Sequence, residues 1–132
     1  MPQTLYLDAS ATVKLIVEEP ESWALVDALA GNQLISSEVC RVELSRALLR
    51  LGLGEGAQRL ARTVVERIEL LRLDEQILDR ASDVGPSDLR ALDSIHLASA
   101  LALGRELDAV ITYDGRLARA AEGAGLVATA PA

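Results

Sequence analysis

Four acidic residues lie in four separate segments of the chain, each embedded in apolar sequence. They are Asp8 in TLYLDASA, Glu43 in RVELSRAL, Asp93 in RALDSIHLASA and Asp114 in VITYDGRLA. An ionised carboxylate in apolar surroundings is costly unless a cation or hydrogen-bond donors meet it. Carboxylate oxygens suit Mg²⁺ and Mn²⁺, and ions bound in this way activate water at a phosphate. The pattern predicts a carboxylate metal site and favours a metal-dependent phosphodiesterase.

The segments around these acids predict strands that lead into helices. A β-type run, Thr4 to Asp8, precedes an apolar helical pattern that Pro20 breaks, and Ala109 to Thr112 precedes a helix from Asp114 to Glu122. The remaining predicted strands are residues 33–36, 68–73 and an edge strand at 126–128; the remaining predicted helices are residues 21–30, 38–51, 55–67, a helix from Asp74 to the Gly85–Pro86 break, and one from Ser87 or Asp88 to Leu103. This alternation predicts a three-layer α/β/α fold with a small, mostly parallel sheet of four or five strands.

The predicted architecture places two of the acids together. Asp8 and Asp114 would follow the carboxyl ends of their strands, where open α/β sheets form their binding crevices. Glu43 and Asp93 would reach the same crevice from flanking helices. The helix that carries Asp93 is apolar on nearly all sides from Ile95 onward, which indicates a buried helix.

Composition limits the class of protein. A length of 132 residues predicts one domain, residues 1–132, and the single Cys40 excludes an intrachain disulfide. The longest apolar stretch, Leu97 to Leu103, is far shorter than the roughly 20 residues of a membrane span. No secretory leader pattern is seen at the start, so a reducing cytoplasm is the expected compartment. A net charge of −7 opposes a general nucleic-acid-binding surface but does not fix the sign of a local one.

The four acidic segments, in this order and over nearly the whole chain, resemble the PIN-domain nucleases and, among them, the VapC-type toxins of bacterial toxin–antitoxin pairs. The resemblance extends over LDASATVKLIVEEPES, VELSRALLR, LRALDSIHLASALALG and AVITYDGRLARAA. It implies that Asp8, Glu43, Asp93 and Asp114 are catalytic and hold one or two Mg²⁺ or Mn²⁺ ions that drive RNA cleavage.

The resemblance also implies partners. A small DNA-binding antitoxin would hold the chain inactive, with its tail across the acidic pocket, and the chain would form a homodimer. The helix predicted at 38–51 presents Val39, Val42, Ala47, Leu48 and Leu51 as its apolar side. The sequence predicts more apolar helix surface than a small sheet covers, and such surface marks an interface. The residues that offer it are Leu15, Ile16, Val39, Val42 and Leu48.

Several residues near the acids allow two interpretations. Ser10 is either a hydroxyl near the metal or the N-cap of the first helix, and Thr112 is either such a hydroxyl or simply a strand residue. His96 lies on the same helix face as Asp93, and we favour a buried structural histidine over a general base. Arginine pairs that follow two of the acids either meet RNA phosphates or are solvated; they are Arg46 with Arg50 and Arg116 with Arg119. Gly52, Gly54 and Gly56 follow a helix, which favours a connector over a nucleotide-binding loop.

Two further classes of function remain open at this stage. The first is a phosphotransfer domain, either a haloacid-dehalogenase-like phosphatase or a response-regulator receiver, since both place an Asp after the first strand. Against it, Asp8 is followed by Ala9 and Ser10 without a second Asp, and no lysine follows the last strands. The second is a binding module that keeps this fold without activity, because a fold alone does not determine function.

Overall fold

The computed structural model describes residues 1–132 and contains one five-stranded sheet. Its strands are β1 (Thr4–Leu7), β2 (Gln33–Ser37), β3 (Glu69–Leu71), β4 (Ala109–Ile111) and β5 (Ala128–Thr129). The strand order is β3-β2-β1-β4-β5, and every neighbouring pair is parallel. The prediction of a small parallel sheet of four or five strands is confirmed.

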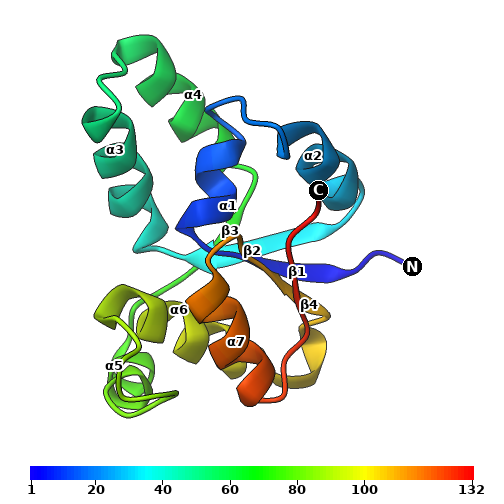
Figure 1. Ribbon diagram of the computed structural model, residues 1–132, viewed down its shortest axis with the longest axis vertical. Helices are drawn as coiled ribbons and strands as arrows, with labels where there is room; N and C mark the ends of the chain where they lie inside the picture. Colours follow the sequence, from blue (N-terminus) through cyan, green and yellow to red (C-terminus); the bar gives the residue numbers. More distant parts are fainter.

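Helices cover both faces of the sheet. They are α1 (Ala9–Lys14), α2 (Ser22–Leu29), α3 (Cys40–Arg50), α4 (Glu55–Val65), α5 (Glu75–Ala81), α6 (Ala91–Ala102) and α7 (Gly115–Gly123), with a 3₁₀ turn η1 (Gly104–Glu106) before β4. Figure 1 shows α1 to α4 on one side of the sheet and α5 to α7 on the other. The three-layer α/β/α prediction is therefore confirmed. None of these helices combines the length and the apolar character that crossing a bilayer requires.

Strand β1 lies at the centre of the sheet and is buried on both faces. Leu5 and Leu7 pack with Leu25 of α2 on one face, whereas Tyr6 packs with Leu97 of α6 on the other. This division follows from the alternation of side chains along a strand. A central parallel strand covered by helices on both faces reads as a continuous apolar run, as TLYL does.

Helix α3 packs on α1 through a narrower stripe than the sequence predicts. Its buried residues are Cys40, Leu44 and Leu48, whereas Val42 is 63% exposed and Leu51 is 55% exposed. Residues four apart lie on one helix face, so the stripe at 40, 44 and 48 leaves the neighbouring apolar positions outside. The exposure of Val42 agrees with the prediction of uncovered apolar surface, whereas Leu48 is buried and is not available to an interface.

Helix α6 begins later than predicted. Its N-cap is Arg90, and Ser87 and Asp88 lie in a turn in which the Leu89 amide donates to the Pro86 carbonyl (3.0 Å). Pro86 favours the turn and separates it from the helix. The prediction of a buried helix is confirmed, because Ser94 and every residue from His96 to Ala100 are buried.

The packing of α3 can be tested with two adjacent leucines. Leu48 is fully buried and Leu49 is 57% exposed. We expect Leu48→Ala to lower the free energy of unfolding by about 2–5 kcal/mol, because a buried side chain is replaced by a cavity. The matched control Leu49→Ala should change it by no more than about 0.5 kcal/mol. Urea denaturation of both variants measures this, and equal losses would contradict the helix orientation.

Candidate active site

All four predicted site residues lie at the carboxyl edge of the sheet. Asp8 directly follows β1, and Asp114 comes three residues after β4. Glu43 lies in the first turn of α3, just after β2, and Asp93 in the first turn of α6, which runs back toward the start of β4. Strands β1 and β4 are neighbours at the point where the strand order reverses, the usual place for a ligand crevice in such sheets.

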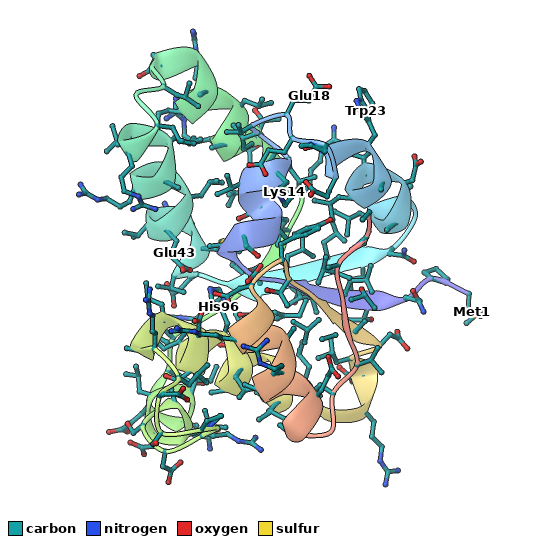
Figure 2. All side chains as sticks on the ribbon, viewed as in Figure 1. Met1, Lys14, Glu18, Trp23, Glu43 and His96 are labelled. Carbon is teal, nitrogen blue, oxygen red and sulfur yellow. The ribbon has the colours of Figure 1, made fainter.

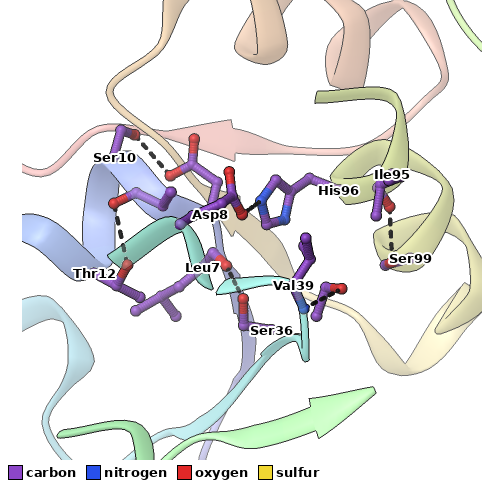
Figure 3. Close-up of polar contacts among 12 residues, drawn as sticks. Leu7, Asp8, Ser10, Thr12, Ser36, Val39, Ile95, His96 and Ser99 are labelled. Atoms are coloured by element: carbon purple, nitrogen blue, oxygen red, sulfur yellow. Dashed lines mark hydrogen bonds and ion pairs between the residues drawn. The ribbon is translucent and has the colours of Figure 1, made fainter. Parts of the chain in front are cut away.

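Asp8 is a buried carboxylate held by three donors. The residue is only 3% exposed to solvent. Oδ1 accepts from the Ser10 hydroxyl at 2.7 Å, as Figure 3 shows. Oδ1 also accepts from the Ala11 amide (3.0 Å), and Oδ2 accepts from the Thr112 hydroxyl (2.5 Å). Burial raises the pKa of Asp8, and the two hydroxyls oppose that rise by stabilising the charged form. The carboxylate therefore has a fixed position and a charge that its surroundings only partly stabilise.

The same two hydroxyls connect Asp8 to the segment that carries Asp114. Ser10 Oγ accepts from the Tyr113 amide (2.8 Å), and Thr112 Oγ1 accepts from the Asp114 amide (3.0 Å). The N-cap of α1 is Asp8 itself, so the interpretation of Ser10 as N-cap is wrong: Asp8 precedes the helix with extended backbone and reaches the Ala11 amide. Thr112 lies just past β4 and contacts Asp8 rather than serving only as a strand residue.

Asp93 and Asp114 lie across one pocket from each other. Asp114 caps α7 by accepting from the Arg116 amide at 2.9 Å. Burial raises the pKa of Asp93, and the negative charges of Asp114, Asp8 and Glu43 raise it further. Because each of the other three acids acts on Asp93, all four carboxylates share one electrostatic environment.

Glu43 contacts a buried histidine, which in turn contacts a buried tyrosine. His96 is 1% exposed, and its Nε2 lies 2.7 Å from Glu43 Oε1, while its Nδ1 lies 2.7 Å from the hydroxyl of Tyr6. Burial raises the pKa of Tyr6, so its hydroxyl is a donor. An imidazole that accepts from the Tyr6 hydroxyl at Nδ1 and donates from Nε2 to Glu43 satisfies all three groups. Figure 2 shows Glu43 and His96 approaching each other from α3 and α6.

These contacts decide between the two interpretations of His96. Both ring nitrogens are occupied, so the histidine is a buried structural residue that orients Glu43, as favoured from the sequence. The sequence does not indicate that Tyr6 is part of the site. Its only sequence signal is a hydroxyl on the face of β1 opposite to Leu5 and Leu7, which does not reveal a partner on a helix 90 residues later.

The donor set suits a hard divalent ion, although the carboxylates do not form a closed cage. No three His, Cys, Asp or Glu side chains stand close enough together to hold one ion as they lie. The oxygen donors nevertheless suit a divalent cation. Its positive charge would also relieve the repulsion between Asp93 and the other acids. The residues fit such an ion in chemistry and charge, and their roles as catalytic residues and metal ligands remain predictions.

Comparison with known proteins agrees with this arrangement. A family model described as the PIN domain matches residues 5–123. The chain belongs to the PIN-domain family. It is 44% identical over 128 residues to Ribonuclease VapC46 of Mycobacterium tuberculosis (strain ATCC 25618 / H37Rv), with 96% of this chain and 97% of that protein covered.

Solved structures share this PIN fold at low sequence identity. The crystal structure of Mycobacterium tuberculosis VapC20, a Sarcin-Ricin loop cleaving toxin, superposes with a TM-score of 0.76 at 15% identity and covers 96% of this chain and 99% of its own. VapBC2 from Rickettsia felis, bound to a DNA fragment from their promoter, has a TM-score of 0.70 at 15% identity and covers 98% of this chain and 100% of its own. At this identity the likeness establishes the fold.

The repulsion at Asp93 predicts a pH-dependent gain in stability for Asp93→Asn. The folded-state pKa of Asp93 is raised, so ionising it disfavours the folded state as pH rises through the interval above its unfolded value of about 3.9. We expect the variant to melt at a higher temperature than the wild type at neutral pH, with the difference narrowing as pH falls toward that value. Melting temperatures across this range measure it, and a gain that does not change with pH would contradict an electrostatic cause.

Proposed function

We propose that this chain is a metal-dependent endoribonuclease that acts as the toxin of a type II toxin–antitoxin pair. The observation that carries the proposal is the placement of Asp8, Glu43, Asp93 and Asp114 at one sheet edge, where three of the acids raise the pKa of the fourth. The identity of 44% to a ribonuclease over 96% of this chain supports the reaction class.

Each acid has a role that follows from its surroundings. Asp8 provides a rigid carboxylate, since three donors fix it. Glu43 is oriented by His96, and Asp114 by the amides at the start of α7, to which it is the cap. Burial and the charges of Asp114, Asp8 and Glu43 oppose the charged form of Asp93 and raise its pKa, so a bound cation would relieve this repulsion.

A bound Mg²⁺ or Mn²⁺ would lower the pKa of a water molecule and stabilise charge at the scissile phosphate. The chain's own contribution is to hold the carboxylates at the carboxyl ends of β1 and β4. The chemistry of hydrolysis then needs no imidazole, which is consistent with the occupied ring nitrogens of His96.

The alternatives have less support. A receiver needs a lysine after its last strands, whereas the only lysine is Lys14, in α1. A phosphatase of the haloacid-dehalogenase type needs a second Asp two positions after the first, where this chain has Ser10. A catalytically silent binding module is disfavoured because all four acids are present and hydrogen bonds orient Asp8, Glu43 and Asp114.

Removal of one acid should abolish cleavage without unfolding the protein. We expect Asp8→Asn and Asp93→Asn to lower the rate of RNA cleavage by at least about 100-fold, because each removes a charge that the ion needs. The matched control Asp79→Asn, on the exposed side of α5, should cleave at the wild-type rate. Cleavage in excess EDTA, or full activity of Asp93→Asn, would contradict the mechanism.

We further propose that the chain acts in the cytoplasm, as a homodimer, and is inhibited by a small DNA-binding antitoxin. The VapBC2 complex bound to promoter DNA supports this kind of partner. A groove of about 620 Å³ opens beside the acids between α1 and α3, and its apolar lining includes Val13, Val39 and Val42. An antitoxin tail that folds on binding would bury these side chains and place a basic group near the acids.

Expression in bacteria tests the biological role. We expect the chain alone to slow growth and the Asp8→Asn variant to be harmless at the same protein level. Co-expression of the neighbouring small gene with the wild-type chain should restore normal growth. Size-exclusion chromatography should give a dimer for the isolated chain. Normal growth at high levels of active protein would contradict the toxin role while leaving the nuclease proposal standing.

A further inference from the structure

A second, entirely polar pocket lies on the α6–α7 side of the acids. Its volume is about 310 Å³, and none of the six residues that line it is hydrophobic. They are Arg90, Asp93, Asp114, Gly115, Arg116 and Arg119. Three arginines from two segments of the chain thus share one small pocket with two of the four acids.

These arginines face acids without pairing with them. The salt bridges of the structure use Lys14, Arg62 and His96, and none uses Arg90, Arg116 or Arg119. The three guanidinium groups are exposed and form no ion pair in the structure, so they are free to bind an anionic ligand in this pocket.

The backbone helps to place one of the arginines. Arg116 and Arg119 are three residues apart on α7 and therefore lie on one face of the helix. A Cβ at Gly115 would lie only 3.2 Å from Arg119 Nη1. The guanidinium of Arg119 thus occupies space over the first turn of α7 that a side chain at position 115 would take.

The start of α7 does not itself supply the anion site. The Arg116 and Leu117 amides, which point out of the first turn, already donate to the Asp114 carboxylate. An anion in this pocket would be held by guanidinium groups, whose planar forks match two phosphate oxygens at once.

We propose that Arg90, Arg116 and Arg119 form a subsite for the RNA backbone phosphate next to the scissile one. The inference rests on the proposed ribonuclease function and adds how a chain of net charge −7 holds RNA beside four carboxylates. On the other side of the acids, Arg46 and Arg50 line the groove that contains Glu43. The acids therefore lie between two arginine groups, and a strand that crosses them meets positive charge on both sides.

The test uses binding without catalysis. A short single-stranded RNA with a fluorescent label is titrated in EDTA, at several salt concentrations, with the wild type and with Arg119→Gln, Arg90→Gln and their double variant. We expect the double variant to raise Kd about tenfold at low salt. The slope of the logarithm of the association constant against the logarithm of the salt concentration should fall in magnitude by about 0.7, the value for one phosphate on a single strand.

Two controls separate the subsite from general charge. Arg105→Gln changes the net charge equally, but Arg105 lies in η1 at the opposite edge of the sheet, so Kd should not change. Gly115→Ala keeps every charge and should displace the Arg119 guanidinium, giving a smaller rise in Kd without any loss of thermal stability. An equal loss in Arg105→Gln, or wild-type binding by the double variant, would overturn the subsite.

The outcomes also distinguish the subsite from the proposed function. Arginine-dependent RNA binding without any metal-dependent cleavage would leave the subsite standing and remove the nuclease. Cleavage with unchanged binding in the double variant would keep the nuclease and remove the subsite. A single methylphosphonate linkage, placed on either side of the cut, then identifies the phosphate: the neutral linkage that weakens wild-type binding should not weaken the double variant further.

Discussion

The carboxyl edge of the sheet depends on the burial of one carboxylate, that of Asp8. A carboxylate at 3% exposure is destabilised unless donors replace its water, and here Ser10, Thr112 and the Ala11 amide do so. Two of these donors are hydroxyls that also accept from amides next to Asp114. Satisfying one buried charge therefore fixes the ends of both central strands, and with them the spacing between two of the acids.

The other two acids are added from opposite layers. Glu43 comes from α3 and Asp93 from α6, and the contact of Tyr6 with His96 extends from the centre of β1 through α6 to Glu43. The acids are thus supported from the sheet and from both helical layers. The support stops short of neutralising the site, since burial and three like charges raise the pKa of Asp93. This repulsion lowers the stability of the folded protein, as is common at sites that bind a ligand.

Much of this arrangement follows from local sequence, and the remainder from contacts between distant segments. The strand before Asp8 and the helix after Asp114 are visible as apolar runs that end at an acid, and parallel topology then brings both to one edge. The exposure of Val42 depends on which stripe of α3 meets α1, which periodicity alone leaves open. The partners of His96 and the role of Ser10 depend on residues about 50 to 100 positions away, and Arg90 meets α7 residues that lie about 25 to 30 positions further along the chain. No local pattern specifies those contacts.

The central claim is that the four carboxylates act together as one divalent-ion site. Titration of Mn²⁺ into the purified protein, followed by the loss of free-ion electron paramagnetic resonance signal, measures this directly in the absence of RNA. We expect saturable binding by the wild type, a large loss of affinity in each of Asp8→Asn, Glu43→Gln, Asp93→Asn and Asp114→Asn, and no change in Asp79→Asn. Wild-type affinity in any one of the four variants, or no saturable binding by the wild type, would contradict it.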